Sequence, residues 1–330
     1  MTNPESDPLE LSLAAGDTDC GIEVLTPREV PLGGLRAMQV RRTLPQRSRS
    51  LIGAWCFVDH YGPDDVAETG GMRVAPHPHT GLQTVSWLFE GEIEHRDSAG
   101  HHALVRPREV NLMTGGRGIS HSEVSTAATT RLHGVQLWVA LPDATRDAAP
   151  GFEHYVPEAV AGKGWQARVF LGELLGSRSP VRTHTPLLGV QLDLVAGTRL
   201  AVPVDPSYEH GVLVDRGDVR LDDRDVASGD LAYADPGRRL LTITALTDSR
   251  LVLLGGPPFG EEIVMWWNFV GRSHEEIVGF REEWQAQITR DGQVVGDSRA
   301  VADGRFGVVD QPLAPIPAPV LPHARLRGRR

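Results

Sequence analysis

Two pairs of potential metal ligands are each spaced two residues apart. They are His77 and His79 in the run His77-Pro78-His79, and His121 and Glu123 in the run His121-Ser122-Glu123. Alternate side chains of a β-strand point to the same face. If each pair lies on a strand and both strands face one interior, three imidazoles and one carboxylate converge. Such a donor set suits a divalent transition metal. The two pairs together predict a metal site that a single H-x-H motif would not.

The expected ion is one divalent transition metal per chain. Four protein ligands would complete the coordination of a tetrahedral zinc, and such closed zinc sites are structural. An ion that prefers six ligands, such as Fe(II), would keep two positions for substrate and dioxygen. Fe(II) is therefore the expected cofactor, with Ni, Co, Mn, Cu and Zn as alternatives. Glu123 is the one base among the four residues, so we expect it to be catalytic as well as a ligand.

Other histidines receive structural interpretations. His95, His101 and His102 lie in or near the turn between the two ligand pairs and are expected to face solvent. His60 and His133 are expected to be core histidines with satisfied hydrogen bonds, because nothing in their spacing favours a metal role.

Composition limits the class of protein. The chain has 330 residues, a net charge of −10 and only two cysteines, Cys20 and Cys56. The length suffices for two domains, and the negative charge argues against nucleic acid or an anionic membrane as partner. No apolar run is long enough for a membrane span, and the first residues lack a signal pattern. Two cysteines are too few for a disulfide framework, which predicts reduced thiols in a cytoplasmic protein.

The pattern of apolar residues predicts an all-β protein with two domains. Short apolar runs broken by Gly, Pro and Asp extend from Ile22 to about Leu141 and again from Arg168 to about Leu254, as in antiparallel barrels. The expected segments are a disordered start (1–20), a metal-binding domain (21–142), a linker (143–167), a second domain (168–290) and an extended Pro-rich tail (291–330).

The two β-rich blocks resemble a degraded repeat. Residues 89–94 correspond to residues 214–219. Counting back from Gly91 and Gly217 places Pro203 and Asp205 at the positions of His77 and His79. Counting forward from the acidic residues Glu109 and Asp230 places Thr242 and Thr244 near the positions of His121 and Glu123. His210 is the one histidine nearby, so the second domain is expected to hold no metal.

A helix is predicted at 273–288, within the second domain. Ser273 and Glu276 form a capping-box pattern, and Ile277, Phe280 and Trp284 follow at helical spacing. The apolar face of this helix is expected to pack against a barrel.

The motifs also resemble those of a known family. Gly71 followed by His77-Pro78-His79 resembles the first cupin motif, and the run HPHTGLQTVSWLFEGEIEHRDSAG (77–100) resembles a pirin signature. Residues 110–123, VNLMTGGRGISHSE, are similar to the second pirin signature. The resemblance implies a bicupin, which consists of two antiparallel jelly-roll β-barrels. It also implies metal only in the first barrel, bound by His77, His79, His121 and Glu123.

The resemblance further implies an activity. Pirin-like proteins resemble quercetin 2,3-dioxygenases, which open the flavonol ring with O₂ and release carbon monoxide. The expected substrates are therefore small aromatic or enolic compounds, with Glu123 as proton acceptor. The chain departs from the family pattern at Gln83, where pirins commonly have Glu, and at Arg108, where a turn glycine is usual. The alternative implied by the family is a regulatory protein whose metal tunes binding to a transcription factor or a metabolic enzyme.

Overall fold

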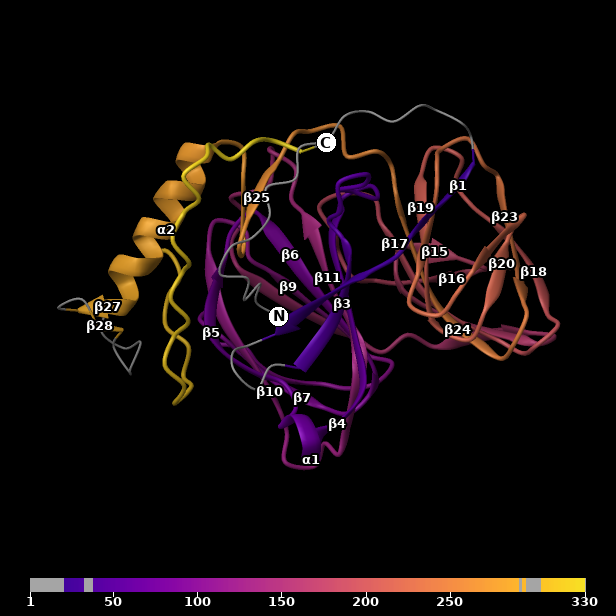
Figure 1. Cartoon of the computed structure of the whole chain (residues 1–330), viewed down its shortest axis with the longest axis horizontal. Helices are drawn as coiled ribbons and strands as arrows, with labels where there is room; N and C mark the ends of the chain where they lie inside the picture. Colours follow the sequence, from indigo (N-terminus) through magenta and orange to yellow (C-terminus); the bar gives the residue numbers. More distant parts are fainter. Residues whose placement is uncertain (1–20, 33–37, 291–292, 295–303, 330) are drawn as a thin grey trace.

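The computed structural model describes residues 21–32, 38–290, 293–294 and 304–329. Two antiparallel β-barrels lie side by side along the long axis of the molecule (Figure 1). The predicted all-β bicupin architecture, with a C-terminal helix, is thereby confirmed. The segment 1–20, expected to be disordered, and Cys20 lie outside the described residues. None of the helices in the described ranges is long and apolar enough to cross a membrane.

The first barrel consists of a large and a small sheet. The large sheet is formed in order by β12 (Gly151–Tyr155), β9 (Val110–Thr114), β6 (Leu82–Glu90), β11 (Arg131–Ala140), β4 (Trp55–Asp65), β3 (Met38–Leu44) and β2 (Arg28–Leu32). The small sheet is formed by β5 (Arg73–His79), β10 (Ile119–Ser125), β7 (Ile93–Asp97) and β8 (His102–Val105). A short helix, α1 (Val66–Thr69), follows β4.

The second barrel repeats this plan. Its large sheet is formed in order by β1 (Ile22–Leu25), β22 (Leu231–Ala234), β19 (Glu209–Arg216), β24 (Ser249–Gly256), β17 (Leu188–Leu194), β14 (Trp165–Leu171) and β13 (Ala159–Gly162). Its small sheet is formed by β18 (Arg199–Pro203), β23 (Leu240–Ala245), β20 (Val219–Leu221) and β21 (Arg224–Val226). A hairpin of β15 (Glu173–Leu174) and β16 (Ser177–Arg178) follows β14.

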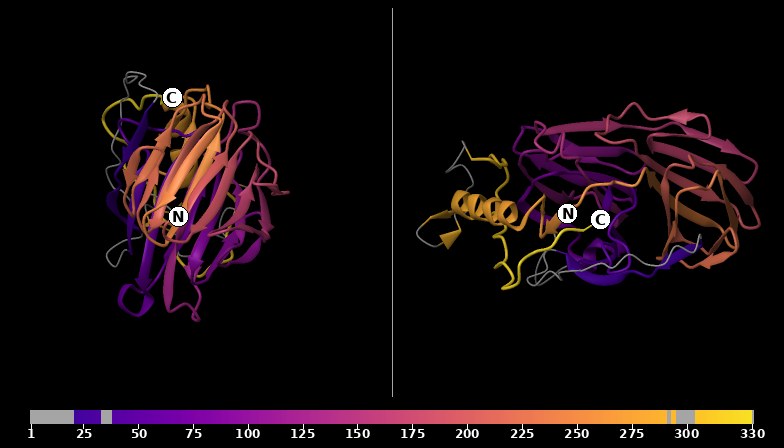
Figure 2. Two further views of the ribbon diagram at one scale, coloured as in Figure 1. Left: turned by 90° about the vertical axis from the view of Figure 1, so that its right-hand side faces the viewer. Right: turned by 90° about the horizontal axis from the view of Figure 1, so that it is seen from above.

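The two barrels share a buried apolar core. Val85 and Trp87 of β6 belong to the same hydrophobic cluster as Phe170 of β14 and Leu213 of β19. The rings of Trp87 and Phe170 stack at 4.6 Å between centroids, and the indole N–H of Trp87 donates to Gln191 Oε1 at 2.8 Å. Seen from above, the barrels form one continuous body (Figure 2). This shared core predicts that neither barrel moves freely against the other.

Each end of the chain crosses to the barrel that is distant in sequence. β1, expected in the first domain, pairs with β22 of the second barrel. The segment 143–167, expected as a linker, contains β12, which pairs with β9, and β13, which pairs with β14. After the second barrel, the hairpin of β25 (Val264–Trp266) and β26 (Phe269–Gly271) returns to the first barrel, where Phe269 forms a bridge with Thr80.

The C-terminal helix lies against the first barrel and not the second (Figures 1 and 2). α2 spans His274–Ile288, and the Ser273 side chain accepts a hydrogen bond from Glu276 N, so the predicted cap is present. Trp284 is buried in a cluster with Phe269 and Phe306. The following hairpin pairs β27 (Thr289–Arg290) with β28 (Gln293–Val294). In the Pro-rich tail, Ile316 N donates to Pro76 O at 2.9 Å. The tail therefore joins α2 to β5.

Candidate metal centre

The predicted ligands lie on neighbouring strands of the small sheet in the first barrel. His77 and His79 are on β5, and His121 and Glu123 are on β10. The two strands are antiparallel, with His121 directly opposite His77. A register shift follows between His121 and Glu123. Because side chains alternate along each strand, all four point to the barrel interior, where the histidines are fully buried and Glu123 is 1% exposed.

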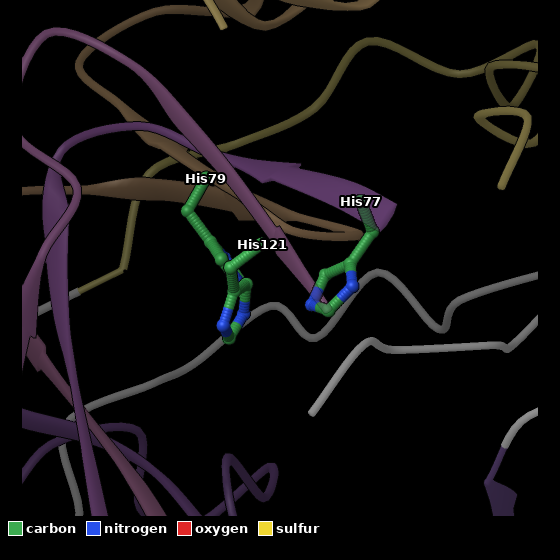
Figure 3. A group of neighbouring side chains, drawn as sticks. All are labelled: His77, His79 and His121. Carbon is green, nitrogen blue, oxygen red and sulfur yellow. The ribbon is translucent and has the colours of Figure 1, made fainter. Parts of the chain in front are cut away.

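Three of the four predicted residues converge closely. The Nε2 atoms of His79 and His121 are 3.0 Å apart, and the ring centroids of His77 and His121 are 4.4 Å apart. Figure 3 shows the His79 and His121 rings adjacent, with His77 facing them. Two nitrogens bound at right angles to an ion at about 2.1 Å would be separated by about 3.0 Å. The spacing of the imidazoles thus fits a transition metal.

Hydrogen bonds fix the tautomers of these imidazoles. The Nδ1–H of His77 donates to Ala75 O at 2.9 Å, and that of His79 donates to Asn268 O at 3.2 Å. In each ring the Nε2 lone pair is left for another partner, and Nε2 of His77 is buried without one among the described residues. Histidines that bind metals almost always donate their second ring nitrogen in this way. Asn268 belongs to the loop between β25 and β26, which explains why this segment returns to the first barrel.

His121 is oriented by His95, which we expected to face solvent. His95 lies on β7, opposite Glu123, and is 3% exposed. Its Nε2 lies 3.3 Å from Asp97 Oδ2, and its Nδ1 lies 3.3 Å from His121 Nδ1. Since a carboxylate only accepts, His95 donates to Asp97, and His121 donates to His95. The prediction of an exposed His95 is wrong because β7 pairs with β10 and directs this side chain into the barrel.

His101 and His102 are closer to the expectation. His101 is 38% exposed and bonds to Asp97, and His102 is 52% exposed and bonds to Glu94. Burial by itself would raise the pKa of Asp97, but hydrogen bonds from His95 and from the His101 backbone lower that pKa below its usual value. Asp97 is therefore a stable anion at the end of the hydrogen-bond chain that runs through His95 to His121.

Glu123 forms a second, overlapping group of potential ligands with His121 and His95. Since His121 belongs to both groups, the Glu123 carboxylate lies beside the three-histidine group, on the side of His121. Tyr61 is near enough for the charge of Glu123 to act on it. Burial is the largest cause that raises the pKa of the Tyr61 phenol well above its usual value, and the charge of Glu123 is the second. The phenol is therefore protonated, and its buried hydroxyl has no partner among the described residues.

Two stacked aromatic rings lie beside the site. The Trp138 ring meets His79 edge-on at 5.2 Å and stacks on Phe57 at 4.0 Å. Gln83 lies on the other face of β6, which it shares with Val85 and Trp87 of the core between the barrels, and it donates to Thr114 Oγ1 at 3.0 Å. Arg108 adopts a φ of +66°, the conformation that its usual glycine would take.

Burial controls the charge of the three histidines. It is the largest cause of the low pKa values of His77, His79 and His121, which lie well below the usual histidine range. All three imidazoles are therefore neutral at neutral pH. Only the neutral ring has a lone pair for a metal ion.

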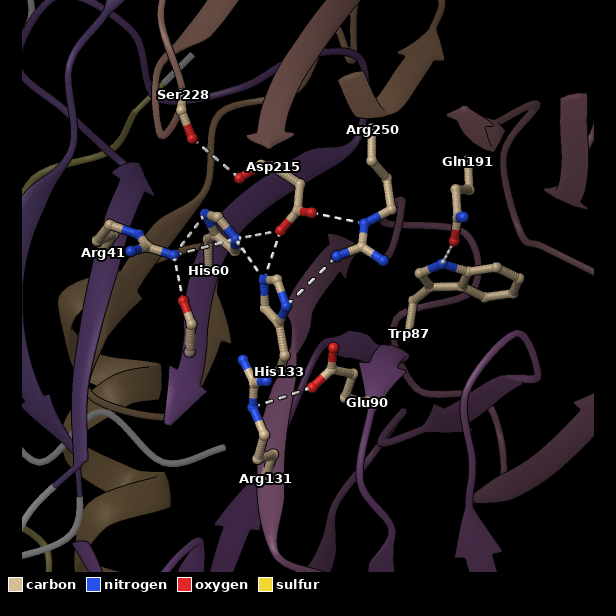
Figure 4. A network of polar contacts seen from close by, with 11 residues as sticks. Arg41, His60, Trp87, Glu90, Arg131, His133, Gln191, Asp215, Ser228 and Arg250 are labelled. Carbon is tan, nitrogen blue, oxygen red and sulfur yellow. Dashed lines mark hydrogen bonds and ion pairs between the residues drawn. The ribbon is translucent and has the colours of Figure 1, made fainter. Parts of the chain in front are cut away.

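A second cluster of potential ligands lies between the barrels. His60 and His133 of the first barrel approach Asp215 Oδ1 of the second at 2.8 and 2.6 Å (Figure 4). Two arginines also belong to this cluster. Arg250 Nε donates to Asp215 Oδ2 at 2.6 Å, and Arg41 Nη2 lies 3.1 Å from His60 Nε2. Two adjacent guanidinium cations disfavour a metal cation. We therefore interpret this cluster as a polar network that joins the barrels.

The fold and the three-histidine site define the class of protein as a bicupin with a candidate metal centre in its first barrel. The family model described as "Pirin" matches residues 36–139, and "Pirin C-terminal cupin domain" matches residues 189–289. The chain therefore belongs to the pirin family.

Several relatives agree with this assignment. A Pseudomonas aeruginosa protein named "Putative quercetin 2,3-dioxygenase PA1205" is 41% identical over 83% of this chain and 86% of that protein. A Caulobacter vibrioides pirin-like protein is 37% identical over 75% of this chain and 88% of that protein. The crystal structure of quercetin 2,3-dioxygenase from Acinetobacter baumannii has a TM-score of 0.84 and 38% identity, covering 93% of this chain and 97% of that chain.

Proposed function

We propose that this protein is a metal-dependent dioxygenase that acts on flavonols or related enolic aromatic compounds. The observation that carries the proposal is the convergence of three neutral imidazoles whose Nδ1 atoms already have partners. His77, His79 and His121 would hold one divalent metal through Nε2, with Glu123 as the fourth ligand. The names of the Pseudomonas relative and the Acinetobacter structure support the substrate class.

Fe(II) is the ion that we propose. When bound, it would supply Lewis acidity toward a phenol or enol oxygen and redox chemistry with O₂. Three neutral histidines and one carboxylate would leave a site charge of about +1 with a divalent ion, which favours an anionic oxygen from the substrate.

The residues of this chain would perform the remaining tasks. The carboxylate of Glu123 would accept the proton from the substrate hydroxyl. The buried phenol of Tyr61 stays protonated. Its hydroxyl could donate a hydrogen bond near the substrate oxygen and Glu123, where negative charge shifts as the proton is transferred. The ring of Trp138 would limit the space beside His79 to a flat substrate and exclude water. We place this activity in the cytoplasm, in keeping with Cys56 as a buried free thiol.

Oxygen uptake tests the proposal. Iron-loaded protein should consume O₂ when quercetin is added and release carbon monoxide, and the metal-free protein should do neither. Absence of O₂ uptake across a panel of flavonols and catechols, with the iron site fully loaded, would refute the dioxygenase.

The role of Glu123 is tested separately. Glu123→Gln should bind iron more weakly through the three histidines. Its turnover per bound iron should fall by about 10²–10⁴-fold because general-base action is lost. Glu94→Gln is the matched control, since Glu94 lies on neighbouring β7 and pairs with Arg96 outside the site. Undiminished turnover per iron in Glu123→Gln would show that Glu123 is not the base.

A further inference from the structure

The turn between β25 and β26 presents its backbone to the candidate metal centre. This hairpin belongs to the large sheet of neither barrel and lies between α2 and the first barrel (Figure 1). Only Trp267 and Asn268 separate its strands, since Trp266 pairs with Phe269. The carbonyl oxygen of Asn268 accepts the Nδ1–H of His79 at 3.2 Å. A segment far along the chain therefore completes the hydrogen bonding of a predicted metal ligand.

Trp267 holds this turn in a conformation that a tryptophan rarely adopts. Its φ is +52°, and two-residue turns that need a positive φ at this position favour Gly or Asn there. A residue with a Cβ atom is strained at such a φ, and the strain persists only where the surroundings hold it. Trp267 is 2% exposed. It packs in an apolar cluster, here called the C-terminal cluster, with Phe269, Trp284 and Phe306. Packing of the indole therefore opposes a relaxation that would move the Asn268 carbonyl.

The C-terminal cluster also holds the tail against the second ligand strand. The Phe306 ring meets the Trp284 ring at 5.5 Å between centroids. The hydroxyl of Ser120 donates to Phe306 O at 2.8 Å. Ser120 directly precedes His121 on β10, so this bond fixes the backbone from which that imidazole extends.

A third link reaches the remaining histidine. The indole N–H of Trp284 donates to Ile316 O at 2.8 Å, and Ile316 N donates to Pro76 O at 2.9 Å. Pro76 directly precedes His77 on β5. The segment that follows the second barrel is therefore bonded to, or directly beside, each of the three converging histidines.

We propose that the C-terminal cluster positions the metal ligands, and that Trp267 is its central positioning residue. Packing of Trp267 keeps the Asn268 carbonyl on Nδ1 of His79 and so sets the direction of the Nε2 lone pair. The inference rests on the proposed metal centre, but it does not depend on the dioxygenase activity. It concerns the affinity of the site for a divalent ion.

Two substitutions of Trp267 separate the turn from its packing. Both Trp267→Ala and Trp267→Gly remove the indole, but only glycine adopts a positive φ without strain. The Ala variant should release the turn, and its dissociation constant for Fe(II) should rise about 10- to 100-fold, as for other partners of metal-binding histidines. The Gly variant should keep the turn and bind Fe(II) more tightly than the Ala variant does. Anaerobic competition with a coloured chelator measures both constants. Wild-type affinity in the Ala variant, or a Gly variant that binds no more tightly than it, would overturn the proposal.

The link at Ser120 gives a second test that leaves the C-terminal cluster intact. Ser120→Ala removes the hydroxyl that bonds to Phe306 O and should weaken Fe(II) binding about two- to tenfold. Ser122→Ala is the matched control. Ser122 follows His121 on the same strand and is equally buried, but its hydroxyl has no hydrogen-bond partner among the described residues. The control should bind Fe(II) as the wild type does, and equal affinities in the two serine variants would contradict the proposal.

Metal-free protein provides a readout that a general loss of stability would not change. The hydrogen bond to Asn268 O keeps the proton of His79 on Nδ1. NMR of the ring nitrogens of ¹⁵N-labelled histidine should show this tautomer in the wild type and in Trp267→Gly. Trp267→Ala should carry the proton on Nε2 in a larger fraction of molecules. A wild type that binds no Fe(II) would refute the metal centre, and the tautomers would still decide whether the turn positions His79. The same tautomer populations in all three proteins would overturn the proposal.

Discussion

Replacing His95 by Phe should weaken metal binding although His95 is not itself one of the three converging histidines. In the wild type, His95 Nδ1 accepts the Nδ1–H of His121 at 3.3 Å. The variant leaves that buried donor without an acceptor, which costs about 1–3 kcal/mol. The cost corresponds to a dissociation constant about 5- to 150-fold larger. An effect of this size agrees with measured effects of residues that orient metal ligands. The Phe152 ring lies 4.8 Å from that of His95. The new phenyl ring can therefore pack against Phe152.

The assay is anaerobic competition for Fe(II) with a coloured chelator. His101→Phe is the matched control, because His101 also bonds to Asp97 and stacks near Phe152 but does not contact His121. It should bind iron as tightly as the wild type does. Unchanged affinity in His95→Phe, or an equal loss in both variants, would show that the chain from Asp97 through His95 does not orient His121.

Three further predictions concern stability. Asp215→Asn should cost about 3–5 kcal/mol of unfolding free energy, measured by urea denaturation, because Arg250 loses its buried counter-ion between the barrels. Trp284→Ala should cost about 3–5 kcal/mol, measured in the same way, because a fully packed indole is removed from beneath the tail. His210→Phe should lose less stability than wild type as pH falls from about 6.5 to 4. Between these pH values His210 of the unfolded wild-type chain is protonated, whereas folded His210, with a pKa of about 4, stays neutral. Proton binding therefore favours the unfolded state of the wild type.

Each of these predictions has a matched comparison. Asp225→Asn removes the partner of Arg220 at the surface of the same barrel and should leave stability nearly unchanged; a similar loss in both Asp variants would contradict the interdomain role. Trp284→Phe should lose much less than Trp284→Ala, and wild-type stability in the Ala variant would mean an unpacked helix. Parallel stability curves against pH for wild type and His210→Phe would show that His210 does not titrate as predicted.

The convergence of three histidines could be predicted from the sequence because it depends on local geometry. His77 and His79 share a strand, and so do His121 and Glu123, so the alternation of side chains within each strand decides their direction. The cap of α2 was predictable for the same reason, since Ser273 and Glu276 are neighbours in the chain.

Features that depend on pairing between distant segments were not predictable. The burial of His95 follows from the register between β7 and β10, which no local pattern records. The partners His60 and Asp215 are 155 residues apart and meet only because the two large sheets pack together. β1 has four residues and pairs at a sheet edge, so its composition cannot indicate which barrel accepts it. The side of the molecule that α2 covers is likewise set by the returning β25–β26 hairpin.

We propose that each chain binds one metal ion, and that it binds in the first barrel. Elemental analysis of purified protein tests this claim most directly. Wild type loaded with Fe(II) should contain about one equivalent per chain, and the His77→Ala/His121→Ala double variant should contain almost none, because two of the four proposed ligands are lost. The variant should stay folded by circular dichroism, since the barrel core does not depend on these residues. A folded double variant that keeps one equivalent, or a wild type that binds two, would contradict the claim.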